Sequence, residues 1–182
     1  MPPSTTPNTI LRRFRRNRRG SAAVEFALVA PLFFAVLFAI IELALVFFSS
    51  QILETVTQDT ARLIMTGQAQ NAKYTQAKFK EEVCAKLTVM FDCLNGVSID
   101  VQNYKEFSTL NIADPIVTSP IDGKKDFVPP NNYLPGGPGD IVVVRLFYKW
   151  PIFITGLGFN LANLRDSKRL LTATAAFQNE PY

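Results

Sequence analysis

The chain of 182 residues contains no histidine and only two cysteines. Without histidine it cannot form a Ser-His-Asp triad, a His-assisted cysteine nucleophile or an imidazole-ligated metal site. Two cysteines cannot hold a zinc ion or an iron–sulfur cluster without other ligands. The sequence also has no phosphate-binding glycine loop and no convincing nucleophile–base set. We therefore predict that the protein is not an enzyme and uses no metal and no cofactor.

Net positive charge is confined to one short arm. The formal net charge is +4, but six of the 19 basic residues are arginines within residues 1–20, which contain no acidic residue. Residues 21–48 carry only two acids and no base, and the remaining 134 residues carry equal numbers of acids and bases. A globular nucleic-acid-binding protein usually spreads its basic residues over a folded face. We expect no nucleic-acid partner, and a disordered arginine-rich tail that binds nucleic acid is the alternative for the arm.

The sequence does contain a long apolar run, from Phe26 to Phe48, interrupted only by Glu42. As a helix these 23 residues would be about 34 Å long, enough to cross a hydrocarbon core of about 30 Å. The run has no polar stripe and is too long for the core of a cleaved secretory signal. A buried helix of a soluble protein is the alternative, but only 134 residues remain to cover it. The sequence therefore predicts a transmembrane helix over residues 21–48.

Charge asymmetry around the run predicts its orientation. Six arginines precede it, and the first basic residue after it is Arg62. The positive-inside rule then places the N-terminus in the cytoplasm and residues 49–182 across the membrane. The expected domains are a basic leader over 1–20, the transmembrane helix over 21–48 and an external domain over 49–182.

The junction between the leader and the transmembrane helix carries an acidic residue, Glu25. Gly20 ends the basic segment, and Glu25 follows five residues later at the start of the apolar run. An ionised carboxylate inside a membrane is costly, which makes such a residue a candidate for function. The simpler alternative is that Glu25 reaches interfacial water.

This junction resembles the processing signal of type IV pilin-like proteins, and most closely the TadE-like pseudopilins of the Tad (Flp, type IVb) pilus system. Four features carry the resemblance: Gly20-Ser-Ala-Ala-Val-Glu-Phe-Ala-Leu-Val-Ala-Pro31, the second acid at Glu42, the segment from Arg62 to Gln68, and Leu170-Leu-Thr-Ala-Thr-Ala-Ala-Phe-Gln-Asn-Glu-Pro181. The match is dense near the N-terminus and at the end of the chain, and loose between them.

The resemblance implies a processing site formed by Gly20, Ser21 and Glu25, with a prepilin peptidase cutting between Gly20 and Ser21. Glu25 would become the fifth mature residue and attract the amine of a neighbouring subunit, which would set the register of assembly. The implied partners are the prepilin peptidase, other pilins and pseudopilins, the pilus assembly platform and inner-membrane lipid. The protein would be a minor pilin or pseudopilin of the bacterial inner membrane, with a periplasmic C-terminal domain, that helps to build a pilus for adhesion. The alternative is a non-polymerising bitopic envelope protein whose periplasmic domain binds or scaffolds a secretion component.

Further features of the long helix can be predicted from its sequence. Pro31 cannot donate to the carbonyl of Ala27, so we expect a kink there. Glu42 lies about 26 Å along the helix from Glu25, which predicts a carboxylate near the far interface and in contact with solvent. A polar and apolar pattern continues the helix over 49–66, and Gly67 is a candidate C-terminal cap.

The external domain is predicted to be α+β with an antiparallel sheet, as in type IV pilin-like proteins. Apolar residues alternate with polar ones over 97–102 and 171–178, and residues 141–150 form a more apolar strand. Apolar residues at a spacing of four predict a second helix over 76–91. Residues 115–138 hold six prolines and three glycines, which predicts a long irregular loop. Residues 152–159 are apolar and are expected to cover the core.

The two cysteines, Cys84 and Cys93, would lie on opposite sides of one continuous helix. A disulfide between them requires the second helix to end near Asp92 and the chain to turn back. An oxidising periplasm favours this bond, and two free thiols are the alternative.

Overall fold

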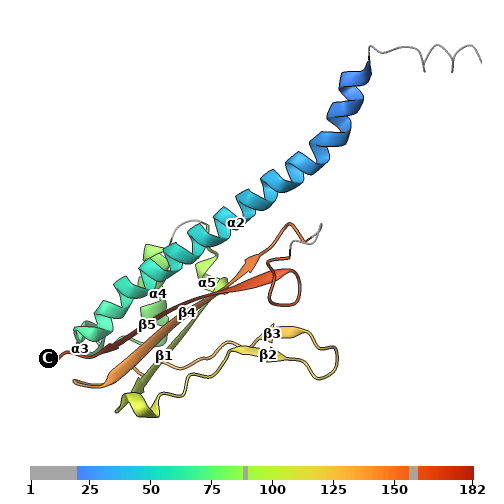
Figure 1. Ribbon diagram of the computed structural model, residues 1–182. Helices are drawn as coiled ribbons and strands as arrows, with labels where there is room; N and C mark the ends of the chain where they lie inside the picture. The colour runs from blue at the N-terminus through green and yellow to red at the C-terminus, as the bar shows by residue number, and fades with distance from the viewer. Residues whose placement is uncertain (1–19, 88–89, 156–159) are drawn as a thin grey trace, which may run out of the picture. The chain divides into compact units, whose positions relative to one another are not determined.

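The computed structural model describes residues 20–87, 90–155 and 160–182. The described residues divide into two units on either side of the Ile41–Glu42 bond, and all the described strands belong to the second unit, Glu42–Tyr182. One helix, α2 (Ser21–Met65), crosses from the first unit into the second (Figure 1). We call its residues 21–41 the apolar half, its residues 42–65 the docked half, and the rest of the second unit, residues 66–182, the head.

Helix α2 confirms the long helix expected from the sequence and ends one residue earlier, at Met65. Glycine ends it for a conformational reason, because Gly67 has a φ of 73° and its N–H donates to the Ile64 carbonyl at 3.0 Å. The α-helix continues through Pro31. The kink at Pro31 stays a prediction.

The main sheet has three antiparallel strands in the order β1-β4-β5, with bounds Val97–Tyr104, Ile141–Pro151 and Lys168–Gln178. In its centre Val144 of β4 lies between Val101 of β1 and Ala175 of β5. These strands confirm all three predicted ones, and each extends the predicted range slightly. Strand β4 is central and buried on both faces, which explains its nearly continuous apolar sequence.

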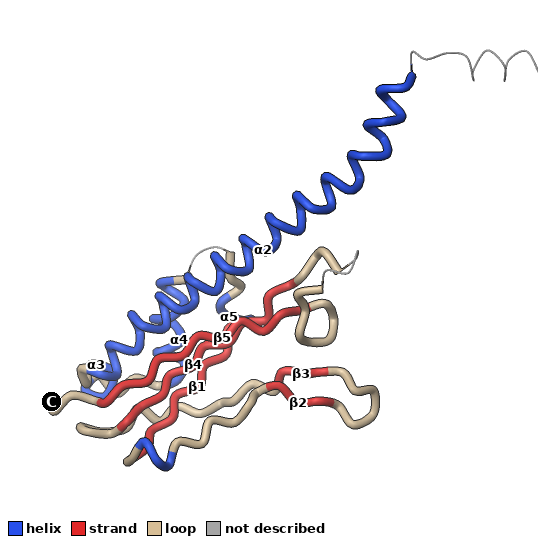
Figure 2. The backbone as a smooth tube through the Cα atoms, viewed as in Figure 1, coloured by secondary structure: helices blue, strands red, loops and turns tan. Residues whose placement is uncertain are grey.

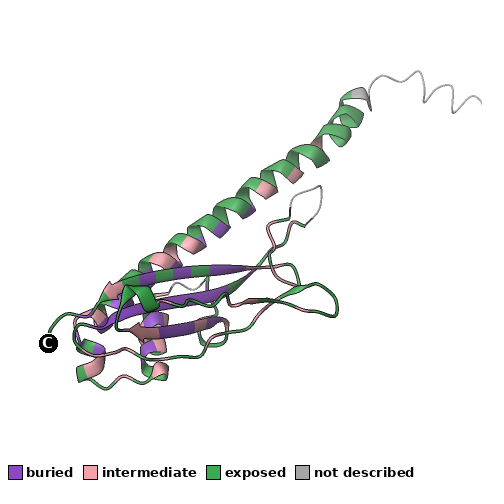
Figure 3. Cartoon of the chain, turned by 60° about the horizontal axis from the view of Figure 1, so that its bottom comes forward, coloured by how far each residue is buried: buried purple, intermediate pink, exposed green. Residues whose placement is uncertain are grey.

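The docked half of α2 packs on one face of this sheet, so the fold is α+β with a pilin-like arrangement (Figures 1 and 3). Its buried residues recur every three or four positions, as one helix face requires. They are Glu42, Val46, Ser49, Leu53, Val56, Thr57, Thr60, Ala61 and Ile64. The hydroxyls of Thr57 and Thr60 donate to the carbonyls of Leu53 and Val56, so these polar groups are buried without losing hydrogen bonds.

Short helices connect α2 to the sheet: α3 (Gln68–Asn71), α4 (Gln76–Lys86) and α5 (Cys93–Gly96). The predicted helix over 76–91 is too long, because α4 ends at Lys86 and Leu87 is extended, with a ψ of 142°. Phe79 and Val83 of α4 do enter the core. Phe91 continues the apolar spacing for a different reason, since its ring packs on Tyr148 and Trp150 from outside the helix.

The predicted irregular loop over 115–138 contains an antiparallel hairpin that the sequence pattern does not predict (Figure 2). Its strands are β2 (Ile116–Thr118) and β3 (Lys125–Phe127), preceded in the chain by the short helix η2 (Phe107–Thr109). Gly123, with a φ of 66°, lies in the turn. The ring of Phe127 packs on that of Phe147, so the hairpin covers part of the second face of β4.

Neighbouring residues of the segment after β4 differ in their burial. Ile152 is buried in the core, as expected, but the side chain of Phe153 is 79% exposed. The rest of the apolar segment, residues 156–159, lies outside the described residues.

Candidate functional site

The predicted processing site lies where α2 begins. Gly20 directly precedes the helix and is exposed, and a Cβ built on it meets no atom within 4 Å. The described part of the fold therefore does not itself require glycine at position 20. The arginines of the predicted leader, residues 1–19, lie outside the described residues.

Glu25 is exposed in the second turn of α2. Among the described residues, no cationic group forms an ion pair with it. Glu25 thus has no partner in the described part of its own chain that would explain a carboxylate beside so many apolar groups. Its predicted role in subunit register stays a prediction.

The apolar half of α2 exposes large apolar side chains on all its sides. Helix α2 is long and apolar enough, over Ala22–Met65, to cross a membrane by length and composition. This is consistent with single-pass anchoring. The exposed side chains are Val24, Phe26, Leu28, Val29, Leu32, Phe33, Phe34, Val36, Leu37, Phe38, Ile40 and Ile41.

The docked half begins with a buried carboxylate, which corrects the expectation that Glu42 contacts solvent. Glu42 is only 6% exposed, and its carboxylate accepts hydrogen bonds from the backbone N–H groups of Phe153, at 2.5 Å, and Ile154, at 3.1 Å. These N–H groups follow the end of β4, beyond the last residue paired with β5. Glu42 therefore joins the first turn of the docked half to the segment that leaves β4.

The other end of α2 is held by the C-terminus of the chain. The N–H of Glu180 donates to the carbonyl of Met65 at 2.9 Å, which satisfies one of the carbonyls left free at a helix end. A Cβ on Gly67 would come within 2.4 Å of the Tyr182 ring, so the ring requires glycine there as well as the positive φ does. Two separate segments that carry the family resemblance, around Gly67 and before Pro181, are thus in contact.

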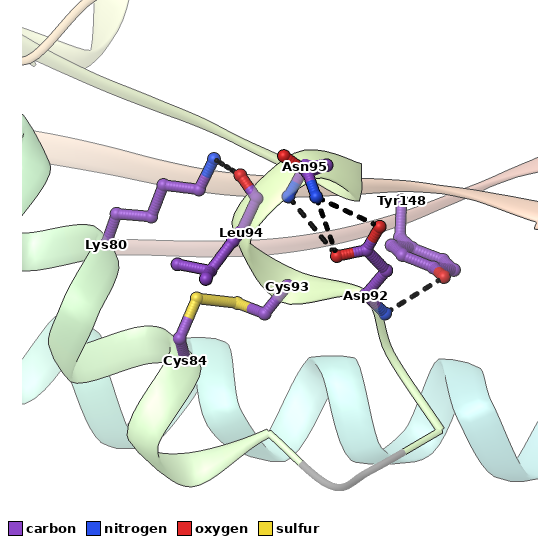
Figure 4. Close-up of a disulfide and its surroundings, with 7 residues drawn as sticks. All are labelled: Lys80, Cys84, Asp92, Cys93, Leu94, Asn95 and Tyr148. Carbon is purple, nitrogen blue, oxygen red and sulfur yellow. Dashed lines mark hydrogen bonds between the residues drawn. A yellow bond between two sulfur atoms is a disulfide. The ribbon is translucent and has the colours of Figure 1, made fainter.

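A disulfide joins α4 to α5 (Figure 4). The Cα atoms of Cys84 and Cys93 are 5.5 Å apart, and the break between the two helices gives them this approach. Nearby, Lys80 Nζ donates to the Leu94 carbonyl at 2.9 Å, and the N–H of Asp92 donates to the Tyr148 hydroxyl at 3.3 Å. The bridge and these bonds fix the entry into β1.

A buried ion pair lies on the second face of the sheet. Arg145 of β4 donates to Asp100 of β1 at 2.7 and 3.0 Å, and the two residues are direct partners in the strand register. Asn132 and Gln102 donate to the same carboxylate, and Arg145 also donates to the Ala113 carbonyl. Because every member has several partners, the pair ties the long connection between β1 and β4 to the sheet.

Asp140 closes the same connection just before β4. The N–H of Gly137, then Lys105 and Asn103, donate to its carboxylate and lower the pKa of Asp140 from 3.8 to about 2. Burial, and then the nearby Tyr74, raises the pKa of Tyr133 to about 12; its ring packs on Phe79.

A cavity of about 460 Å³ opens beside the outer edge of β1, next to the place where Val101 bonds to Asn132 and Leu134. Lys80 is the one charged residue among its described lining residues, so the lining offers no carboxylate or thiolate for catalysis. Among the described residues, no three side chains of the ligating types gather where they could hold a metal ion. The lining residues are Gln76, Ala77, Lys80, Val97, Ser98, Ile99, Pro129, Pro130 and Asn131.

The sequence singles out Gly20 and Glu25, whose functional roles stay predictions. It does not predict the Glu42 contact, the Asp100–Arg145 pair or the contact of Tyr182 with Gly67. A weak signal existed for the ion pair, because Arg145 interrupts the most apolar strand of the chain. No local signal existed for the Glu42 contact, since its partners follow more than a hundred residues later.

The fold and the helix together define a class: an α+β protein with a pilin-like arrangement, in which a long apolar N-terminal helix packs on an antiparallel sheet. Residues 20–62 match the family model described as TadE-like protein, so this segment of the chain is similar to the TadE-like family. No curated protein and no solved structure matches the chain. The family match indicates a pilin-like protein associated with the Tad pilus machinery, in a family of generally non-enzymatic structural proteins.

Proposed function

We propose that this protein is a minor pilin or pseudopilin subunit required for assembly of a Tad (Flp) type IVb pilus, and that a prepilin peptidase cleaves it after Gly20. One observation carries the proposal: an exposed carboxylate, Glu25, lies five residues after Gly20 on a helix half that is apolar on every side. The head does not explain this pattern. Lipid before assembly and neighbouring subunits afterwards would explain it.

Cleavage would give Glu25 its partner. It would create an α-ammonium group at Ser21, at the start of a helix whose dipole also favours the negative carboxylate nearby. When apolar helices pack side by side, a carboxylate that lacks a cation among them is penalised. An incoming subunit would therefore be stable only in the register where its amine meets the Glu25 of its neighbour.

In this proposal the protein is a substrate and not a catalyst. Its partners are the prepilin peptidase, other pilins and pseudopilins, the assembly platform and inner-membrane lipid. It is inserted once in the bacterial inner membrane, with the arginine leader in the cytoplasm and the head in the periplasm. After assembly it contributes to a surface pilus used for adhesion.

The test is the N-terminal residue of the protein in cells that produce the Tad system, compared between two variants. Gly20→Ala should block processing and leave the intact precursor. Gly137→Ala is the matched control, because a Cβ at position 137 also meets no atom within 4 Å. It should be processed like the wild type, with Ser21 as the first residue.

Processed protein of normal size from the Gly20→Ala variant would contradict the assigned cleavage site. An intact arginine arm on the wild-type protein would instead favour a bitopic envelope protein that scaffolds a secretion component without polymerising.

A further inference from the structure

The segment Ile152–Thr155, which we call the β4 tip, lies at the level of Glu42 on α2. Two backbone N–H groups of the tip donate to the Glu42 carboxylate, which fixes this level. Glu42 is not at the end of the apolar run, because six residues follow it up to Phe48 and all are uncharged. At 1.5 Å per residue, the run continues for about 9 Å past the tip toward the rest of the head.

The surface of α2 along this stretch is apolar where it faces away from the head. Phe47 is 67% exposed and Phe48 is 57% exposed, and Leu43, Ala44 and Leu45 are exposed as well. Exposed polar side chains begin at Gln51. The change from apolar to polar surface therefore lies beyond the level of the β4 tip, on the side of the head.

The tip itself has the composition expected at such a level. Residues Trp150 to Thr155 carry no charge, and Phe153 is the most exposed aromatic side chain in the described part of the head, at 79%. An aromatic ring facing water on a short loop gains nothing from the fold of the head. It would be stabilised by apolar surroundings, such as the boundary between headgroups and acyl chains.

We propose that the β4 tip inserts Phe153 into the lipid interface, so that the head contacts the bilayer at a second point beside α2. The inference rests on the membrane insertion of α2 assumed under the proposed function. The surface formed by the β4 tip is continuous with the exposed apolar side chains of α2 beside it, and we expect phospholipid to cover it. Glu42 is the positioning residue: it holds the tip against the helix and satisfies two N–H groups that would otherwise enter an apolar layer unpaired.

Depth-dependent fluorescence quenching tests the proposal on the full-length protein in vesicles of phosphatidylcholine and phosphatidylglycerol that contain a doxyl-labelled phospholipid. Two variants each add one tryptophan: Phe153→Trp at the tip and Ile121→Trp in the turn between β2 and β3. Ile121 is the matched control because it is 95% exposed on a different loop. The wild type, with Trp150 as its one tryptophan, supplies the background.

We expect doxyl lipid to quench the added fluorescence of the Phe153→Trp variant at least threefold more strongly than that of the Ile121→Trp variant. Only the Phe153→Trp variant should show a blue-shifted emission. Equal quenching of the two variants overturns the proposal. It is also overturned if the blue shift of the Phe153→Trp variant grows with the protein-to-lipid ratio while quenching by lipid stays absent, because the tip then contacts a second subunit.

Co-flotation of the same samples with vesicles separates this inference from the proposed function. If all three proteins float and the added fluorescence of the Phe153→Trp variant is not quenched, α2 is the membrane anchor and the tip proposal alone fails. If none floats, the membrane insertion of α2 fails, and the tip proposal fails with it.

Discussion

The two halves of helix α2 have the same backbone structure and opposite surroundings. In the docked half, residues from Glu42 to Ile64 form a buried stripe whose spacing matches the sheet beneath it. In the apolar half, residues 22–41 expose apolar side chains in every direction. The head explains the buried stripe of the docked half, whereas the exposed apolar side chains of the apolar half and of residues 43–48 require something outside the chain.

This difference indicates that the buried stripe of the docked half serves the folding of the head, and that the apolar half serves membrane insertion and assembly. Substitutions of buried residues in the docked half or in the head should change the free energy of unfolding of the head. Substitutions in the apolar half should leave that free energy unchanged and affect membrane insertion or subunit packing. Trp150 reports on the head in both cases, because it is the one tryptophan of the chain and is buried in the core.

The largest effect on the head is expected when one partner of its buried ion pair is removed. Asp100→Ala leaves the buried Arg145 guanidinium without its carboxylate and should lower the free energy of unfolding by about 3–5 kcal/mol. Glu25→Ala removes a carboxylate from the apolar half and should leave the value unchanged. Denaturant unfolding of the full-length protein in detergent, followed by Trp150 fluorescence, measures both. A similar loss from the two variants would contradict the separation.

Equivalent leucines on the two halves give the next largest contrast. Leu53 is fully buried and Leu28 is 74% exposed. Leu53→Ala should lower the free energy of unfolding by about 2–5 kcal/mol through lost burial and a cavity. Leu28→Ala should cost the head nothing in the same denaturation experiment. The comparison fails if Leu28→Ala destabilises the head as much as Leu53→Ala does.

The disulfide should have a smaller effect, confined to the head. Closing the short loop between Cys84 and Cys93 should contribute about 2–3 kcal/mol. Replacing both cysteines by serine should therefore lower the denaturation midpoint of the head, and a reducing agent should lower that of the wild type alone. If thiol titration of the unreduced protein finds two free thiols, the bridge is absent in the isolated protein and this prediction is wrong.

The smallest expected effect is a pH dependence from Asp140. Its pKa is lowered to about 2 in the folded head, below its usual 3.8, so folding favours the charged form. The resulting stabilisation is fully present above about pH 4 and is lost as the pH falls toward 2. Asp140→Asn should flatten this part of the stability profile and leave the range between pH 5 and 7 unchanged in slope. An unchanged acid limb in the variant would assign the pH dependence to other carboxylates.

The fold could be predicted from the sequence wherever a local pattern reports on burial. Alternation over Val97–Gln102 predicted β1, and the long apolar run with Gly67 after it predicted α2 and its end. The hairpin of β2 and β3 was missed because its three-residue strands are too short for a pattern and lie among prolines. The early end of α4 was missed because Phe91 keeps the helical spacing while its ring packs on Tyr148.

Sequence patterns single out only the N-terminal part of the candidate site, and the roles predicted for its residues stay predictions. Gly20 and Glu25 stand out because their chemistry conflicts with the apolar residues around them. The position of Glu42 could be placed along the helix axis, but its environment could not, because its hydrogen-bond partners are backbone groups of the distant β4 tip. Because every residue except proline has a backbone N–H group, the sequence does not indicate which of these groups bind a distant carboxylate.

The most direct test of assembly through the apolar half compares two carboxylates on the same helix. Glu25→Gln changes the apolar half, and Glu54→Gln changes a half-buried position of the docked half, where Glu54 accepts a hydrogen bond from Gln58. Quantitative mass spectrometry of sheared pili, normalised to the membrane-bound protein, measures the incorporation of each variant. We predict that Glu25→Gln reduces incorporation at least tenfold and that Glu54→Gln leaves it within twofold of the wild type. Equal incorporation of the two variants would contradict the account.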